Sequence, residues 1–182
     1  MSQRFAGKVA FITGGATGLG AAFAHALSQE GAAVALADID QAHAERTAAK
    51  LTSPSTPVVA LGCDVADEHS VQRAVDACTQ QLGGVDLLIN NAARHLKKYS
   101  RSFSSLTHDE IRGLFDVNVM GIVNCCLACR PAMSERGNGA IVNMASSAGY
   151  TANGPYGVSK VAVRGLTVAF ARELAPDGIR VN

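Results

Sequence analysis

The stretch that decides the fold is "KVAFITGGATGLG", residues 8–20, in which a short apolar run meets a glycine-rich turn. Residues 8–13 predict a buried strand, and the segment from Gly18 to Gly31 predicts a helix that ends at its last glycine. Glycine is a common turn residue, so the glycines alone are weak evidence. Their position between a strand and a helix makes the pattern informative.

The alternation of strands and helices continues along the chain. Further strands are predicted at residues 32–38, 57–62, 86–90, 140–145 and 179–182. Further helices are predicted at residues 40–51, 67–83, 107–134 and 155–175, the third with Pro131 as a point where it could bend or end. Strands that are apolar throughout indicate a parallel sheet covered on both faces. The prediction is a single α/β domain over residues 1–182, a doubly wound Rossmann-type parallel sheet with helices on both faces, ending in the sixth strand.

Composition excludes several classes of protein. The chain has 182 residues, of which 48% are hydrophobic and 17% charged, and its net charge is +1. This balance argues against nucleic acid or an anionic membrane as the main partner. No uninterrupted apolar run approaches the roughly 20 residues that span a bilayer, and the N-terminal stretch lacks the features of a secretory signal. A cytoplasmic location is the resulting expectation.

The five cysteines are an odd number, which argues against a disulfide framework. Residues 125–129, "CCLAC", contain a C-x-x-C spacing that could serve a metal or a redox reaction. Those uses need a second ligand pair or a thioredoxin-like context, and the sequence shows neither. We expect buried helical cysteines and no metal site.

The glycine-rich turn is suited to phosphate binding. Gly14 permits a tight turn, while Gly18 and Gly20 let the backbone approach a pyrophosphate and let the helix pack on the sheet. The free N–H groups and positive dipole end of the helix would face the phosphates. Asp38, at the end of the second strand, can accept hydrogen bonds from the adenosine ribose and would repel a 2′-phosphate. With Ile39 and Thr17 nearby and no adjacent base, NAD is preferred over NADP.

Tyr156 and Lys160, in "GPYGVSK" at residues 154–160, lie four residues apart and therefore on one face of a helix. A phenol ordinarily keeps its proton to about pH 10, and a neighbouring ammonium would stabilise the phenolate. Beside a nicotinamide site this pair predicts acid–base chemistry. The alternative is a packed tyrosine with a solvated lysine.

Several motifs, in order, resemble those of the short-chain dehydrogenase/reductase family. They are "TGGATGLG" (13–20), "CDV" (63–65), "NNAA" (90–93), Asn118 in "DVNVMG", the serine of "NMASSAG" and Tyr-x-x-x-Lys in "YGVSK". The resemblance covers nearly the whole chain. It implies an oxidoreductase that transfers a hydride between the nicotinamide cofactor and a secondary alcohol or ketone.

The resemblance also implies roles for individual residues. Tyr156 would be the general acid/base, Lys160 its partner and a ribose ligand, Asn118 the holder of a relay water, and Ser146 the donor to the substrate oxygen. Asp64 and Val65 would contact the adenine, and Asn91 the neighbouring ribose. The complete predicted cofactor site is Gly14, Thr17, Gly18, Leu19, Gly20, Asp38, Asp64, Val65, Asn91, Tyr156 and Lys160.

Departures from the family pattern leave alternatives open. Ala93 replaces the usual glycine, Ser147 adjoins Ser146, and only ten residues separate Ser146 from Tyr156, so residues 148–155 must take a tight path. Family members continue past the sixth strand into a substrate-covering segment that these 182 residues lack. A non-catalytic dinucleotide-binding protein, or an inactive truncated fragment, is therefore the alternative to an enzyme.

Two surface features bear on partners. Arg94, His95, Lys97, Lys98 and Arg101 crowd the loop 94–106, and predict either steering of an anionic substrate or a solvated basic loop. The family's subunits commonly pair through the two long helices, which implies a homodimer or homotetramer here. Apolar residues such as Val119, Ile122, Val168 and Phe170 would line those helices' outer faces.

Overall fold

A parallel sheet runs through the centre of the protein, with helices on both faces. The computed structural model describes residues 3–94 and 97–182. The sheet has six strands in the order β3-β2-β1-β4-β5-β6, all parallel. The strands are β1 (Val9–Thr13), β2 (Ala33–Asp38), β3 (Val58–Gly62), β4 (Leu87–Asn90), β5 (Ala140–Asn143) and β6 (Arg180–Val181). This order confirms the predicted doubly wound fold.

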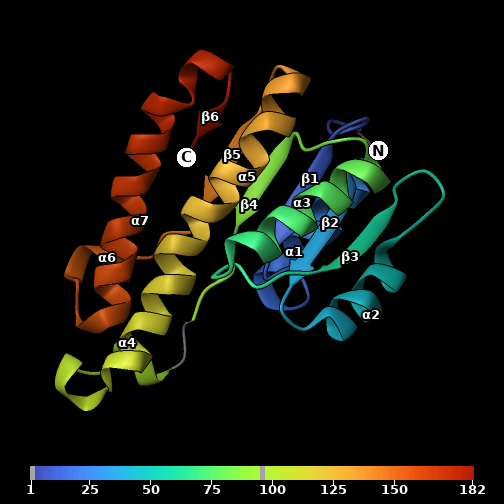
Figure 1. Ribbon diagram of the computed structural model, residues 1–182. Helices are drawn as coiled ribbons and strands as arrows, with labels where there is room; N and C mark the ends of the chain where they lie inside the picture. Colours follow the sequence, from blue (N-terminus) through green and yellow to red (C-terminus); the bar gives the residue numbers. More distant parts are fainter. Residues whose placement is uncertain (1–2, 95–96) are drawn as a thin grey trace.

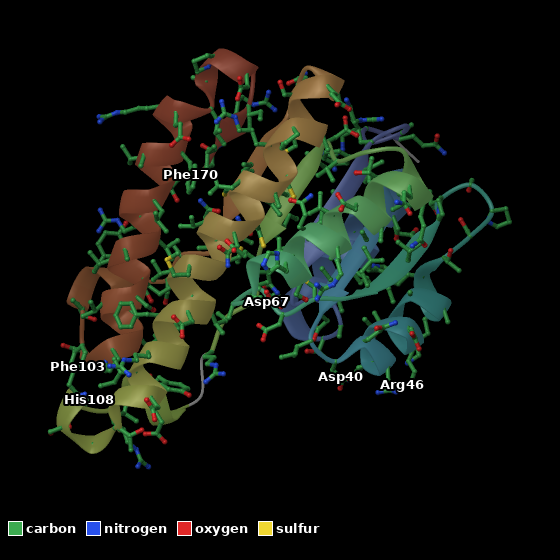
Figure 2. All side chains as sticks on the ribbon, in the orientation of Figure 1. Asp40, Arg46, Asp67, Phe103, His108 and Phe170 are labelled. Carbon is green, nitrogen blue, oxygen red and sulfur yellow. The ribbon has the colours of Figure 1, made fainter. Side chains whose placement is uncertain are left out.

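The helices form one layer on each face of the sheet (Figure 1). On one face lie α1 (Gly18–Gln29) and α2 (Gln41–Leu51). On the other lie α3 (Glu68–Leu82), α5 (Gly121–Arg136) and α7 (Gly154–Glu173). Side chains cap the starts of helices: Asp40 accepts from the His43 N–H at the start of α2, and Thr107 and Glu110 make the capping box of α4 (His108–Phe115). Figure 2 shows Asp40 and Asp67 at the starts of α2 and α3.

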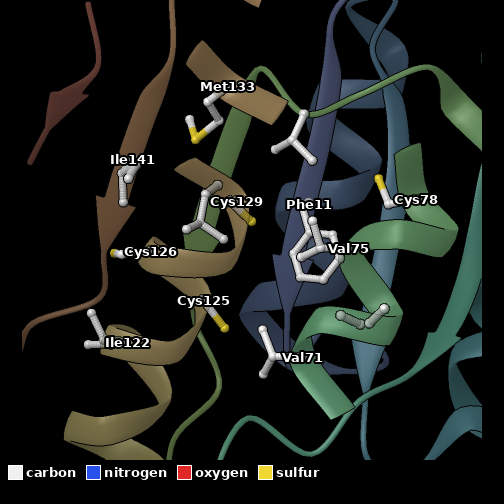
Figure 3. Close-up of a cluster of buried hydrophobic side chains, with 14 of the residues drawn as sticks. Phe11, Val71, Val75, Cys78, Ile122, Cys125, Cys126, Cys129, Met133 and Ile141 are labelled. Atoms are coloured by element: carbon white, nitrogen blue, oxygen red, sulfur yellow. The ribbon is translucent and has the colours of Figure 1, made fainter. Parts of the chain in front are cut away.

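Each central strand is apolar at successive positions because both of its faces are covered. Phe11 of β1 packs toward α3 and α5, while its neighbour Ile12 packs toward α1 and α2. The five cysteines are free and buried. Cys125, Cys126 and Cys129 of α5 lie in the core with Cys78 of α3 (Figure 3), so "CCLAC" serves packing.

Three local predictions need correction. The helix expected at 107–134 runs on to Arg136 but contains one π-helical turn, η3 (Asp116–Met120), between α4 and α5. Pro131 does not end α5, because the helix around it buries Cys126, Cys129 and Met133 and so outweighs the cost of a proline. The fifth strand stops at Asn143, and the expected loop after it contains a short helix, α6 (Ala148–Thr151).

The remaining short elements are single turns. They are η1 (Lys97–Ser100), η2 (Phe103–Ser105) and η4 (Ala175–Asp177).

The continuous helical span His108–Arg136 is long and apolar enough to cross a membrane by length and composition alone. Polar residues such as Asn118 and Asn124 interrupt it, so the sequence shows no uninterrupted apolar run there. In the fold this span buries Ile122, Cys126 and Met133 against the sheet. Its polar Asn118 and Asn124 are hydrogen-bonded to the protein. We therefore interpret it as a core helix of the domain.

Asp86 holds the amino-terminal end of the sheet together. Its carboxylate is 1% exposed and accepts from Lys8 Nζ at 3.0 Å, the Val9 N–H at 2.8 Å and Arg136 Nε at 2.9 Å. Burial alone would raise the pKa of Asp86, but the hydrogen bonds from Arg136, Val9 and Lys8 outweigh it, so the pKa is lowered. One carboxylate thus links β1, β4 and the end of α5.

The first prediction is that Asp86→Asn lowers the free energy of unfolding at pH 7 by about 2 kcal/mol, because two cations lose their counter-charge. The control Lys8→Met should cost about 1 kcal/mol or less, since Lys8 is partly exposed. Because the folded-state pKa is lowered, the stabilisation is present above about pH 4 and disappears below it. Urea titrations from pH 7 to pH 3 measure this. An equal pH dependence in wild type and Asp86→Asn contradicts the assignment.

Candidate active site

A cavity of about 990 Å³ opens at the carboxyl ends of the strands. It lies where the strand order reverses between β1 and β4, the usual ligand position in open α/β sheets. Most of the predicted site residues line it: Gly14, Thr17, Gly18, Leu19, Asp38, Asp64, Val65, Asn91, Ser146, Tyr156 and Lys160. Gly20 and Asn118 are not among the lining residues. Each contacts a residue that lines the cavity: Gly20 lies against Gly14, and Asn118 accepts from the Arg94 N–H.

The glycine-rich turn after β1 has a backbone that requires its glycines. Gly14 and Gly18 have φ angles of +62° and +55°, which side chains disfavour. A Cβ at Gly20 would collide with the Gly14 carbonyl oxygen, so the first turn of α1 packs directly on the loop. Within the described residues no side-chain bond caps α1 at Thr17, and Thr17, Gly18 and Leu19 at its start line the cavity. This cradle fits a pyrophosphate.

Side-chain hydrogen bonds of Thr13 and Asn91 join the carboxyl ends of β1 and β4. The Thr13 hydroxyl accepts from the N–H groups of Asn91 and Ala92, each at 3.0 Å. The Asn91 side-chain amide donates in return to the carbonyls of Thr13 and Gly14, also at 3.0 Å. Asn91 therefore braces the glycine-rich turn besides lining the cavity.

Asp38 lies at the end of β2, with its carboxylate fixed by the backbone. One oxygen accepts from the Ala16 N–H at 2.9 Å and the other from the Asp40 N–H at 3.0 Å. Among the described side chains, two cationic residues line the cavity: Lys160 of α7 and Arg94 of the turn after β4. Neither comes from the elements around Asp38.

Tyr156 and Lys160 lie on one face of α7, at its buried amino-terminal end. The Lys160 ammonium is 5.8 Å from the centre of the Tyr156 ring and donates to the Met144 carbonyl at 2.6 Å. Burial lowers the pKa of Lys160 to about 8. The lysine is therefore buried at the site, unlike the solvated lysine of the alternative interpretation.

Asn118 is held in the π-helical turn by contacts on both ends of its amide. Its oxygen accepts from the Arg94 N–H at 2.8 Å, and its nitrogen donates to Ser159 Oγ at 3.1 Å. Ser159 in turn donates to the Tyr156 carbonyl at 2.7 Å. The turn after β4, the π-helical turn and the first turn of α7 are thereby linked.

Of the two adjacent serines, Ser146 lines the cavity and Ser147 does not. Ser146 Oγ accepts from the Ala148 N–H at 3.2 Å, which orients the hydroxyl toward α6. Ser147 is exposed before α6.

Sequence reasoning missed the bracing role of Ser159 and the position of Arg94. Ser159 follows Tyr156 by three residues, so helical spacing could have placed the two together. Arg94 belongs to the predicted basic loop, but no periodicity indicates which loop residue lines a cavity. Arg101 is not among the lining residues, and His95 and the side chains of Lys97 and Lys98 lie outside the described part.

Comparison with known proteins agrees with the fold and the motifs. The family model "short chain dehydrogenase" matches residues 8–182. An uncharacterized oxidoreductase of Mycobacterium tuberculosis is 38% identical over 98% of this chain and 72% of its own length. The D-threitol dehydrogenase of Mycolicibacterium smegmatis is 38% identical, with 98% of this chain and 69% of the relative covered.

Solved structures give the same result. A short-chain type dehydrogenase/reductase from Mycobacterium marinum superposes with a TM-score of 0.90 and 32% identity, covering 99% of this chain and 72% of that one. An NAD⁺-bound xylitol dehydrogenase gives a TM-score of 0.91 at 33% identity, covering 98% and 69%.

The second prediction concerns the buried lysine. Its folded-state pKa of about 8 lies below the ordinary 10.5, so between these values only the unfolded chain binds the proton. The free energy of unfolding should therefore rise with pH across this window, by about 2 kcal/mol from pH 8 to pH 9.5, relative to Lys160→Met. Urea titrations of both proteins measure the difference. A Lys160 ¹³Cε resonance that titrates only above pH 10 contradicts this prediction.

Proposed function

Because this chain belongs to the short-chain dehydrogenase/reductase family, we propose that it transfers a hydride between NAD and a secondary alcohol or ketone. The observation that carries the proposal is the Tyr156–Lys160 pair at the reaction end of a cavity whose other end is a phosphate cradle. Bound NAD would supply the hydride acceptor. The chain's own residues orient the substrate and move the proton.

Tyr156 is the proposed general acid/base. It removes the alcohol proton during oxidation and returns it to the carbonyl oxygen during reduction. The Lys160 ammonium, protonated below about pH 8, lies 5.8 Å from the centre of the Tyr156 ring and is proposed to stabilise the phenolate. Ser146 is proposed to donate to the substrate oxygen, which its position in the same cavity supports.

Asn118 is proposed to hold a water that relays the proton from Lys160 to solvent. Its side-chain oxygen and nitrogen already bind Arg94 and Ser159. We therefore propose that the water binds the main-chain carbonyl. π-helical turns of this kind are frequent at functional sites.

The cofactor residues are proposed to act in sequence along the cavity. In this proposal the pyrophosphate is surrounded by Gly14, Thr17, Gly18, Leu19 and Gly20, and the adenosine ribose binds Asp38. The adenine contacts Asp64 and Val65, and the nicotinamide half contacts Asn91, Tyr156 and Lys160. The preference for NAD rests on Asp38, since a fixed carboxylate that forms no ion pair with any described residue repels a 2′-phosphate. The NAD⁺-bound xylitol dehydrogenase supports the same choice.

The substrate is proposed to be a small molecule, and the names of the relatives suggest polyols as the first neutral alcohols to test. A cytoplasmic location is part of the proposal, because five buried, unpaired cysteines suit a reducing compartment. A non-catalytic dinucleotide-binding protein on the same fold is the alternative, and the next experiment separates the two.

The third prediction is that Tyr156→Phe lowers kcat by about 10²- to 10⁴-fold while leaving the Kd for NAD within a few-fold of wild type. NADH absorbance with D-threitol, xylitol and other alcohols measures turnover, and calorimetry measures Kd. Tyr150→Phe is the matched control, since that phenol is exposed and its ring stacks on Arg164. If Tyr156→Phe turns over near the wild-type rate, the assignment is wrong, and NAD binding without any turnover in wild type favours the alternative.

The fourth prediction is that NADP binds at least about tenfold more weakly than NAD, and that Asp38→Asn narrows the difference. Asparagine keeps a hydrogen-bond acceptor but removes the charge. Asp40→Asn is the control, because Asp40 caps α2 outside the cavity and asparagine caps equally well. Equal affinities of the wild type for both cofactors overturn this preference.

A homodimer or homotetramer through α5 and α7 is also proposed. Ile122 and Phe170, expected on the outer faces, are buried in the core. Met120 and Leu127 on the α5 side, and Val161 and Val168 on α7, are exposed in pairs seven residues apart, so each pair shares one helical face. Adjacent apolar faces of this kind suit an isologous interface.

The fifth prediction is that light scattering gives at least a dimer at micromolar concentration, and that Leu127→Lys with Val168→Lys dissociates it. The control Ala169→Lys changes an exposed neighbour on α7. A wild type that is monomeric at this concentration contradicts the proposed assembly.

A further inference from the structure

We propose that Arg94 binds an anionic oxygen group of the substrate, so that the site favours hydroxy acids over neutral alcohols of the same shape. This inference rests on the proposed function and names its substrate class. Arg94 follows Ala93 in the turn after β4 and lines the same cavity as Tyr156, Lys160 and Ser146.

The backbone of Arg94 is fixed by a buried partner. Its N–H donates to Asn118 Oδ1 at 2.8 Å, and its carbonyl accepts from Asn118 Nδ2 at 3.4 Å. Asn118 is only 1% exposed and is itself braced by Ser159. The arginine side chain therefore leaves the turn from a set position, as a residue that recognises a ligand requires.

The guanidinium lies at the reaction end of the cavity. Its Nη1 is 3.5 Å from the hydroxyl of Tyr99, a long and weak contact. Tyr99 is buried and packs with Leu114 and Tyr156 in one cluster. The head of Arg94 thus adjoins the cluster that carries the proposed acid/base.

Helix α4 leaves room for the guanidinium. A Cβ placed on Gly113 would lie 2.9 Å from Arg94 Nη1, closer than real Cβ contacts allow, and 3.4 Å from the guanidinium carbon, in ordinary contact. Gly113 also lines the cavity. Because Nη1 is the far end of a flexible side chain, such a Cβ would push the guanidinium aside rather than disrupt α4, so Gly113 permits the present position of the arginine head.

The charge of Arg94 has no counter-ion in the described part of the chain. Arg4, Arg130 and Arg136 each contact a carboxylate at 3.0 Å or less, whereas no carboxylate of residues 3–94 and 97–182 lies within 4.0 Å of the Arg94 guanidinium. Asp116 also lines the cavity but makes no ion pair with Arg94.

A guanidinium with free donors binds a carboxylate, sulfonate or phosphate through two parallel hydrogen bonds. The cofactor's phosphates are expected at the start of α1, on the other side of the cavity, and so leave Arg94 to the substrate. A substrate oxyanion held by Arg94 would keep the reacting carbon beside Tyr156. The unused charge is thus a specificity element of the site.

The test compares matched pairs that differ only in charge: 3-hydroxybutanoate with 3-hydroxybutanamide, and 4-hydroxypentanoate with its amide. We expect the wild type to prefer at least one acid over its amide by about tenfold or more in kcat/KM, and in calorimetric affinity for the NADH-saturated protein. The preference should shrink when NaCl rises from 50 to 500 mM. Acids and amides that bind equally overturn the inference.

Three variants assign the preference to Arg94. Arg94→Gln should abolish it, and Gly113→Ala should reduce it at least threefold, because the new Cβ displaces Nη1, without lowering the melting temperature. The control Arg101→Gln makes the same change on the same loop outside the cavity and should leave the acid preference unaltered. If Arg94→Gln instead weakens the binding of NAD and NADH as much as the binding of the acids, the residue belongs to the cofactor site and the inference fails.

The proposed function can fail separately. If no alcohol yields NADH with the wild type while the acid still binds more tightly than its amide, hydride transfer is refuted and the Arg94 anion site stands. If neutral alcohols are oxidised but no acid is preferred in rate or affinity, the enzyme stands and the Arg94 inference is refuted.

Discussion

The hydroxyl of Thr13 and the amide of Asn91 hold the two halves of the sheet together at the point where the strand order reverses. Thr13 is 1% exposed, and its one oxygen serves the N–H groups of Asn91 and Ala92. Connections leave β1 and β4 toward opposite faces, so the chain must separate here and its backbone groups would otherwise lose partners. These contacts satisfy the backbone while the crevice stays open, and they brace the glycine-rich turn at Gly14.

A series of hydrogen bonds connects the end of β4 to α7, the helix that carries Tyr156. The turn after Asn91 presents the Arg94 backbone to Asn118, Asn118 binds Ser159, and Ser159 binds the Tyr156 carbonyl. A second chain of side chains runs deeper in the sheet: Asn90 donates to Asn143 at 2.8 Å, and Asn143 donates to Thr167 at 3.0 Å. Ser159 and Thr167 lie about two turns apart on α7. The helix is thus fixed at two points along its length, which limits both its tilt and its rotation.

Most elements could be predicted because their patterns are local, whereas the site depends on contacts distant in sequence. Residues 9–12 and 33–37 are apolar because both faces of their strands are covered. The π-helical turn has no such signal in "DVNVM": its stability comes from Arg94 and Ser159, 24 and 41 residues away from Asn118. The lowered pKa of Lys160 likewise results from burial that only the folded chain creates. Residue types at the site were therefore predictable, but their bracing and electrostatics were not.

The buried cysteines have a consequence for the chemistry of the whole molecule. Burial raises the pKa of all five thiols, to about 12 for Cys63, Cys78 and Cys126. The thiolate is the reactive form, so the folded protein offers almost none of it to an alkylating reagent near neutral pH. Four of the five sit between the sheet and helices α3 and α5. Iodoacetamide can reach those four thiols only when this interface opens, so the rate of alkylation measures how often the core opens.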